Sequence, residues 1–185
     1  MTTLRELGEW GLIAALRARF ADLPAGWIGI GDDTAVGTLT PGWQVLTTVD
    51  LLVEEVHFRR STTTASDLGW KALAVNLSDI ASMGGIPRWA VVGLSAPADL
   101  EVDWVLGLYD GLAALAAETG TRLVGGDTTG SGGPVTIAVT VVGEAERPIR
   151  RTGARPGDVV FVTGPGGAAA ARLWANEKPQ RVTGS

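Results

Sequence analysis

Cysteine is absent from the 185 residues of this sequence, and histidine occurs only once. Without cysteine the chain can form no disulfide and no thiolate zinc site, and it has no cysteine nucleophile. Any metal chemistry is therefore expected to use oxygen ligands.

Long apolar runs are also missing. None approaches the ~20 residues that a membrane-spanning helix needs, and the start, MTTLRELGEW, lacks the basic and apolar segments of a signal peptide. We therefore expect a soluble, cytoplasmic protein with no membrane partner.

Basic residues are in the minority, with 15 Lys and Arg against 20 Asp and Glu and a net charge of -5. This balance argues against a nucleic-acid binder, because phosphate backbones need a basic surface. With 45% hydrophobic residues, the chain is long enough for one sizeable core and the start of a second domain.

Periodicity predicts an α/β or α+β fold in which helices pack on one face of a mixed sheet. Helices are expected over 4–20, from a cap at Ser66 and Asp67 to Met83, and over 102–119 before Gly120. Strands are expected over 44–53, 89–96, 121–126, 135–144 and 159–164, and a further helix is expected to begin in 164–174.

Two motifs present acidic side chains that are candidates for cation binding. GDDTAV at 31–36 exposes Asp32 and Asp33 in a glycine turn, which is either a cation-binding loop or an ordinary solvated one. In TTVD, Thr48 and Asp50 point to the same face of the expected strand. They are either ligands for a hard cation or the polar side of an edge strand.

Two further motifs follow. In NLSDIASMGG, Asn76 and Asp79 are three residues apart and share a helix face, opposite a buried stripe of Leu73, Leu77 and Ile80; an ordinary solvated face is the alternative. GGDTTGSGG at 125–133 is expected to be a strand end that runs into a glycine-rich loop. There amides approach phosphate and Asp127 binds the metal, or else the loop is a plain hairpin turn. It lacks the Walker A pattern.

Three arginines and the single histidine are the remaining candidates for functional residues. Arg147, Arg150 and Arg151 form a cluster suited to phosphate, although a solvated basic loop gives the same pattern. His57 follows two glutamates and is either a structural or a functional residue.

The order of these motifs is specific. GDDTAV, TTVDLLVEEVHF, WKALAVNLSDIASMGG, LVGGDTT and RTGARPGDVVFVTG together resemble the amino-terminal portion of thiamine-monophosphate kinase, over about residues 5–170. The superfamily also includes aminoimidazole ribonucleotide synthetase, selenophosphate synthetase and a hydrogenase-maturation protein. The string KALAVNLSD favours the kinase among these relatives.

The resemblance implies Mg²⁺ and ATP as cofactor and co-substrate, thiamine monophosphate as substrate, and a homodimer joined through its sheets. The implied magnesium ligands are Asp33, Thr48, the Val49 backbone, Asp50, Asp79 and Asp127, with Asp32 as a further candidate. The implied ATP contacts are Gly126, Asp127 and Arg151, and the implied substrate contact is His57. No protein nucleophile is expected.

Two departures from the family are visible. Val49 stands where relatives carry a hydroxyl residue, so this position can act only through its backbone. Family members also have a carboxy-terminal half with a Ser-Asp-Gly motif that this sequence lacks. We therefore expect an amino-terminal ATP- and magnesium-binding domain over 1–147 and the start of a truncated domain over 148–185.

The resemblance implies phosphorylation of thiamine monophosphate to thiamine diphosphate by ATP, with little activity in the isolated chain. Two alternatives stay open. One is a non-catalytic nucleotide-binding and dimerisation module, and the other is a related ATP-dependent synthetase of the same superfamily.

Overall fold

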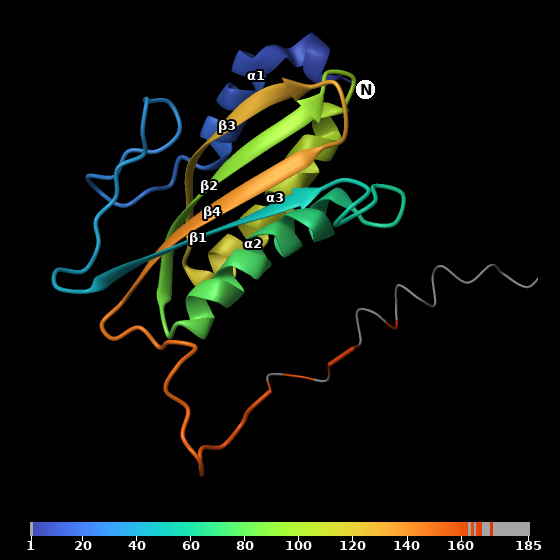
Figure 1. The fold of residues 1–185 in the computed structure, drawn as a ribbon. Coiled ribbons are helices and arrows are strands. Elements are labelled where there is room, and N and C mark those ends of the chain that lie inside the picture. The colour runs from blue at the N-terminus through green and yellow to red at the C-terminus, as the bar shows by residue number, and fades with distance from the viewer. Residues whose placement is uncertain (1, 163, 165, 168–170, 172–185) are drawn as a thin grey trace, which may run out of the picture. The chain divides into compact units, whose positions relative to one another are not determined.

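A computed structural model describes residues 2–162, 164, 166, 167 and 171. The chain divides into two compact units, Met1–Arg150 and Arg151–Ser185, and every helix and strand named below lies in the first. The domain limits expected from the sequence stay a prediction. The helices are α1 (Leu4–Arg19), α2 (Ala65–Ser82) and α3 (Val102–Thr119), and the strands are β1 (Gln44–Val53), β2 (Ile86–Pro97), β3 (Arg122–Ser131) and β4 (Thr136–Ala145) (Figure 1).

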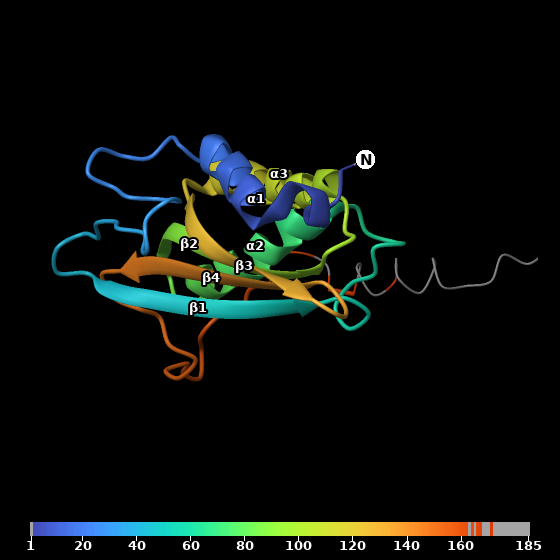
Figure 2. The same cartoon turned by 90° about the horizontal axis from the view of Figure 1, so that it is seen from above.

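The strands form one mixed sheet in the order β1-β4-β2-β3. β4 pairs antiparallel with both β1 and β2, whereas β2 and β3 are parallel. Helices α2 and α3 lie against one face of this sheet, as the two views in Figures 1 and 2 show. The predicted fold class, a mixed sheet with helices on one face, is confirmed, while the joining of sheets across a dimer stays a prediction.

The core lies between the sheet and the helices. Alternate residues of β4, namely Ile137, Val139 and Val141, are fully or almost fully buried. They pack with buried leucines of α2 and α3 in one continuous cluster. The intervening residues Ala138 and Thr140 point to the other face, because side chains alternate along a strand. We call that second side of the sheet the open face.

Helices α2 and α3 approach each other closely through two glycines. A Cβ added at Gly69 would lie 1.9 Å from the carbonyl oxygen of Leu108, and one added at Gly111 would lie 1.9 Å from that of Ser66. Glycine costs about 1 kcal/mol relative to alanine inside a helix. The close contact between the two backbones explains why glycine stands at both positions.

The helix ends follow ordinary capping rules, with one correction to the sequence prediction. α2 begins after Thr64, whose hydroxyl accepts a hydrogen bond from the Asp67 amide at 3.1 Å, so the cap expected at Ser66 and Asp67 was wrong. α3 ends at Gly120 in the left-handed conformation (φ 70°), as predicted. α1 has a kink at Gly8, where φ is 72°.

Two strand predictions were wrong. The strand was expected to end at Gly126 and to run into a glycine-rich loop, but β3 continues to Ser131 and pairs with β2 as far as Pro97. Residues 159–162 were expected to form a strand and have no regular secondary structure. The helix expected to begin in 164–174 lies largely outside the described residues.

The long segment between α1 and β1 is tied to the sheet by a buried acid. Glu144 of β4 is 0% exposed, and its carboxylate accepts hydrogen bonds from the Thr40 amide at 2.7 Å and the Thr40 hydroxyl at 2.6 Å. The Arg88 guanidinium of β2 donates to the same carboxylate from Nε at 2.8 Å. Burial alone would raise the pKa of Glu144, but the hydrogen bonds from Thr40 and Arg88 outweigh it and hold the pKa below its ordinary value.

The same segment folds back on itself before it reaches Thr40. Ile28 and Val36 exchange two backbone hydrogen bonds of 3.0 and 2.9 Å. Trp27 packs edge-on against Trp89 of β2, with ring centroids 5.3 Å apart. Residues 29–35 are therefore the tip of a closed loop whose base is fixed on the sheet.

None of the described helices has the length and apolar character to cross a membrane. The cytoplasmic location expected from the sequence stays a prediction.

Replacing Glu144 with glutamine should destabilise the fold by about 2 kcal/mol near neutral pH, as expected for loss of charge-assisted hydrogen bonds. Because the folded-state pKa is depressed, the stabilisation by Glu144 is present above its ordinary pKa of 4.5 and is lost as the pH falls through the folded value. The difference between wild type and Glu144→Gln should therefore shrink on acidification. Urea unfolding as a function of pH measures it.

Glu146→Gln is the matched control, because Glu146 lies two residues further along and is exposed. It should change stability by less than about 0.5 kcal/mol. Equal unfolding curves for Glu144→Gln and wild type would contradict the anchoring role of Glu144.

Candidate functional site

The largest cavity described lies on the open face of the sheet and has a volume of ≈ 730 Å³. Its floor comes from β2, β3 and β4, its rim from the loop tip 29–35, and one side from Trp10 and Ile13 of α1. The polar residues that line it are Asp32, Asp33, Thr34, Asp127 and Thr140. This size suits a small-molecule ligand such as a nucleotide.

Asp127 reaches the cavity because of its position in β3. It is paired with Gly93 of β2, which is in turn paired with Ala138 of β4, so all three belong to the open face. Gly93 has no side chain and Ala138 a short one. The floor beside the Asp127 carboxylate is therefore shallow and open to a ligand.

Gly126 has a structural reason to be glycine. A Cβ at this position would lie 2.0 Å from the carbonyl oxygen of Val92, so no side chain fits between β3 and β2. Gly126 also lines the cavity. Its proposed ATP contact stays a prediction.

The acidic pair of the loop tip lies at the rim of the same cavity. Asp33 donates its amide to the Asp32 carboxylate at 2.9 Å, and both residues are exposed. The loop base, held by Thr40 and Glu144, keeps this tip over the open face. Asp32, Asp33 and Asp127, which are far apart in the sequence, are thus brought to one cavity.

Thr48, Asp50 and Asp79 lie on the opposite, helix-covered side of the sheet. The Thr48 hydroxyl donates to the Asp79 carboxylate at 2.8 Å, which joins β1 to α2. Asp50 shares the face of Thr48, as predicted, and is paired with the buried Val139. Val49 points the other way and is 55% exposed.

The predicted magnesium ligands are therefore divided between two faces of one sheet. Asp33 and Asp127 line the open-face cavity, whereas Asp50 and Asp79 do not. Within residues 2–162, no three histidine or acidic side chains are grouped closely enough to hold a metal ion by themselves. The complete ligand set stays a prediction.

Magnesium fits the donors that the cavity offers. Mg²⁺ is usually held by one or two carboxylates, with substrate phosphates and water completing its shell. Asp127 and the Asp32–Asp33 pair provide carboxylates at the floor and at the rim. A closed protein cage of three or more acids is not required for this kind of site.

Asn76 does not share the surroundings of Asp79 as the sequence suggested. Its side chain is 0% exposed, and its amide nitrogen donates to the Ala72 carbonyl at 3.0 Å. Asp79, by contrast, is exposed. The buried stripe is confirmed for Leu73 and Ile80, with Leu77 partly buried beside it.

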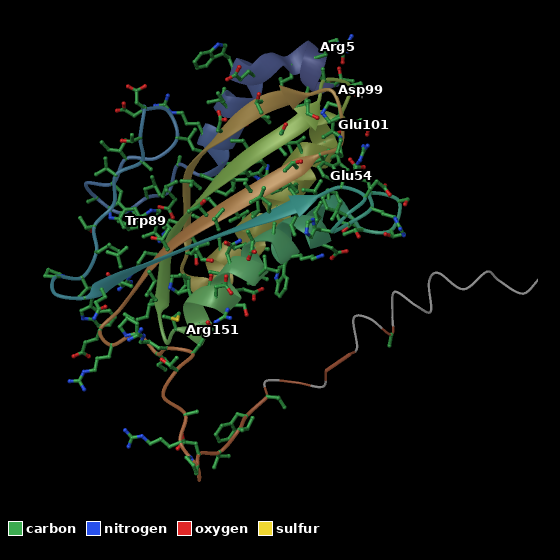
Figure 3. The ribbon with its side chains drawn as sticks, viewed as in Figure 1. Arg5, Glu54, Trp89, Asp99, Glu101 and Arg151 are labelled. Carbon is green, nitrogen blue, oxygen red and sulfur yellow. The ribbon has the colours of Figure 1, made fainter. Side chains whose placement is uncertain are left out.

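His57 lies in a tight turn just after β1. Its ring Nδ1 accepts a hydrogen bond from the Val53 amide at 3.1 Å, and its carbonyl accepts one from the Lys71 ammonium at 2.9 Å. The neighbouring Glu54 is buried, and its carboxylate accepts hydrogen bonds from Arg60 at 2.5 Å and from the Val135 amide at 3.0 Å. Figure 3 labels Glu54 at this end of β1.

Of the basic cluster, Arg147 and Arg150 are exposed and belong to the first unit. Arg151 is also exposed but begins the second unit. Its proposed ATP contact stays a prediction.

Sequence reasoning missed Trp10, Glu54 and Glu144. Trp10 was read only as part of a helix, yet it is 80% exposed and lines the cavity. Glu54 and Glu144 gave a signal that could have been used, since each is an acid at the end of a strongly apolar strand. Their hydrogen-bonding partners are distant in the sequence and could not be named.

Comparison with known proteins gives consistent results. Residues 31–145 match the family model "AIR synthase related protein, N-terminal domain". A thiamine-monophosphate kinase of Bacillus subtilis (strain 168) is 40% identical over 169 residues, which cover 90% of this chain and 52% of the relative.

Two solved structures are similar as well. The thiamine-monophosphate kinase of Stenotrophomonas maltophilia K279a has a TM-score of 0.77 at 41% identity, covering 91% of this chain and 54% of that one. AaThiL complexed with AMPPCP and TMP has a TM-score of 0.69 at 39% identity. The match covers 96% of this chain and 56% of that one.

The chain thus spans about half the length of the curated relatives it matches. The family model covers more than half of the chain, and the described fold is that of the similar structures. The chain belongs to the AIR synthase related family, of which it carries the N-terminal domain, and its similarity within that superfamily is to thiamine-monophosphate kinases.

Proposed function

We propose that these residues belong to a thiamine-monophosphate kinase, which transfers the γ-phosphoryl group of ATP to the phosphate of thiamine monophosphate. The observation that carries this proposal is the 40% identity to the Bacillus subtilis kinase over 90% of the chain. The similarity to AaThiL complexed with AMPPCP and TMP supports the same pair of ligands.

The reaction brings two anionic phosphates together, and phosphoryl transfer needs little covalent help from the protein. Mg²⁺, when bound, supplies positive charge that neutralises the phosphates. Asp127 and Asp33, with Asp32 beside it, are the carboxylates in the cavity that would hold this ion. The bare floor at Gly93 and Gly126 leaves space for the phosphates.

The remaining groups of the site mainly hold the two substrates in position. Arginine forks bind phosphate oxygens through two parallel hydrogen bonds, which is the role we propose for Arg151. No protein nucleophile is needed, because the acceptor phosphate is itself ionised near neutral pH, with a second pKa of about 6.

Phosphoryl transfer is tested with a chimera in which this chain replaces the corresponding residues of the Bacillus subtilis kinase. The chimera should form thiamine diphosphate from ATP and thiamine monophosphate in a magnesium-dependent reaction. Asp127→Asn should lower its kcat/KM at least about a hundredfold, since removing one preorganised electrostatic group costs factors of this order.

Asp103→Asn is the control, because Asp103 is an exposed residue in the first turn of α3. It should leave the rate within about twofold, as is usual for surface substitutions. A folded chimera that binds nucleotide but forms no product would instead favour a non-catalytic nucleotide-binding module.

We also propose that the protein is a homodimer joined through its sheet, at the edge strand β1 and the open face beside it. Three apolar side chains of β1 are more than half exposed there: Val45 at 57%, Val49 at 55% and Leu51 at 53%. β1 is an edge strand of the sheet. An apolar, unpaired edge of this kind promotes association with another strand.

Sedimentation at tens of micromolar protein should therefore show a dimer, whereas Val49→Lys combined with Leu51→Lys should give a monomer, because two charges would be buried without partners. Val56→Lys is the control, since Val56 is 72% exposed in the turn beyond β1. A monomeric wild-type chain would contradict the proposed interface.

A further inference from the structure

Trp10 is exposed on a helix that already has a buried side. Leu12 and Leu16 of α1 are 1% and 5% exposed, whereas Trp10 is 80% exposed. An indole has a large apolar surface, and covering that surface is favourable. Trp10 lines the ≈ 730 Å³ cavity of the open face, so a ligand in this cavity can cover it.

The backbone of α1 explains how Trp10 comes to the cavity. The first turn is fixed, because the Leu4 amide donates to the Leu100 carbonyl at 2.9 Å. Gly8 then interrupts the helix with φ 72° and ψ 167°. A Cβ at Gly8 would have no other atom within 4 Å, so glycine is needed there for its backbone conformation and not for space. After this kink the helix continues with Trp10 and Ile13, which both line the cavity.

The cavity has an apolar side and a polar side. Trp10 and Ile13 of α1 provide apolar side chains. Asp33 at the rim and Asp127 on the floor provide carboxylates, and Gly126 leaves the backbone beside Asp127 bare. A ligand that matches both sides has a flat ring system at one end and a metal-bound anionic group at the other. A nucleoside triphosphate with Mg²⁺ has this character.

We propose that the indole of Trp10 stacks on the base of the bound nucleotide, at the opposite side of the cavity from the carboxylates. This role rests on the proposed function and adds a base-binding residue to it. Stacking on an aromatic side chain uses the π-face of the base and needs no hydrogen-bonding partner. Trp10 thereby increases the affinity for the nucleotide and takes no part in phosphoryl transfer.

Two other occupants could cover the same indole. A second copy of the chain on the open face is one, and Trp10 would then affect sedimentation and would influence all ligands of the cavity alike. The ring system of thiamine monophosphate is the other. The carboxylates favour the nucleotide, because a triphosphate with its Mg²⁺ matches them better than a single phosphate does.

Calorimetry on the whole 185-residue chain separates base from phosphate. The two ligands, each with Mg²⁺, are AMPPCP and tripolyphosphate, which has the phosphates but no base. Trp10→Leu should bind AMPPCP at least about fivefold more weakly than wild type, as for the loss of one stacked base. It should bind tripolyphosphate with unchanged affinity. Trp10→Phe keeps an aromatic ring and should retain most of the affinity for AMPPCP.

Trp70→Leu is the matched control, since Trp70 is 46% exposed on α2, against the other face of the sheet. It should leave both affinities unchanged. Equal weakening of the two ligands by Trp10→Leu would overturn the stacking role. Unchanged binding of AMPPCP would overturn it as well and leave the proposed function standing. A wild-type chain that binds neither ligand would contradict the proposed function and the stacking role together.

The contact itself is observed by proton NMR of the Trp10 indole N–H, whose signal is assigned by its loss in Trp10→Phe. AMPPCP with Mg²⁺ should shift this signal, because the ring current of a stacked base acts on the nearest protons. Tripolyphosphate with Mg²⁺ and thiamine monophosphate should leave it in place. An equal shift with tripolyphosphate, or a shift with thiamine monophosphate and none with AMPPCP, would overturn the proposal.

Discussion

The alternation of side chains across the four-stranded sheet determines which groups can act together in this protein. Val139 of β4 faces the helices, and Asp50, its partner on β1, must face the same way. Asp127 is in register with Gly93 and therefore faces the opposite side. Slipping a strand by one residue would exchange these faces and bury the wrong set, so the hydrophobic core and the positions of the acids are fixed by the same pairing.

Helices cover one face of the sheet and leave the other available for function. The open face carries the ≈ 730 Å³ cavity and the exposed apolar residues of β1. Two buried glutamates attach the segments with candidate functional residues to this sheet. Glu144 fixes the base of the loop that carries Asp33, and Glu54 fixes the turn that carries His57. Rigid attachment of loops to a packed scaffold is how binding residues are usually positioned.

Much of the fold was predictable from local sequence. The β-branched run at Gln44–Val53 and the apolar period of Val102–Thr119 gave both elements with their observed bounds. The stretch 127–131 was mispredicted as a loop, because its pairing with residues 93–97 of β2 joins residues that are far apart in the chain. The division of the acids between two faces, and the partners of Glu54 and Glu144, depend on strand order and on contacts between residues far apart in the chain.

The central claim, that the open-face cavity holds the metal and nucleotide, is tested most directly by paramagnetic NMR. Substoichiometric Mn²⁺ with AMPPCP should broaden the amide signals of Gly126, Asp127 and Asp33 first, because a paramagnetic ion broadens the signals nearest to it most strongly. The signal of Asp103 on α3 should persist. Broadening that begins at Thr48 and Asp79, with Asp127 unaffected, would contradict the claim and assign the metal to the helix-covered face.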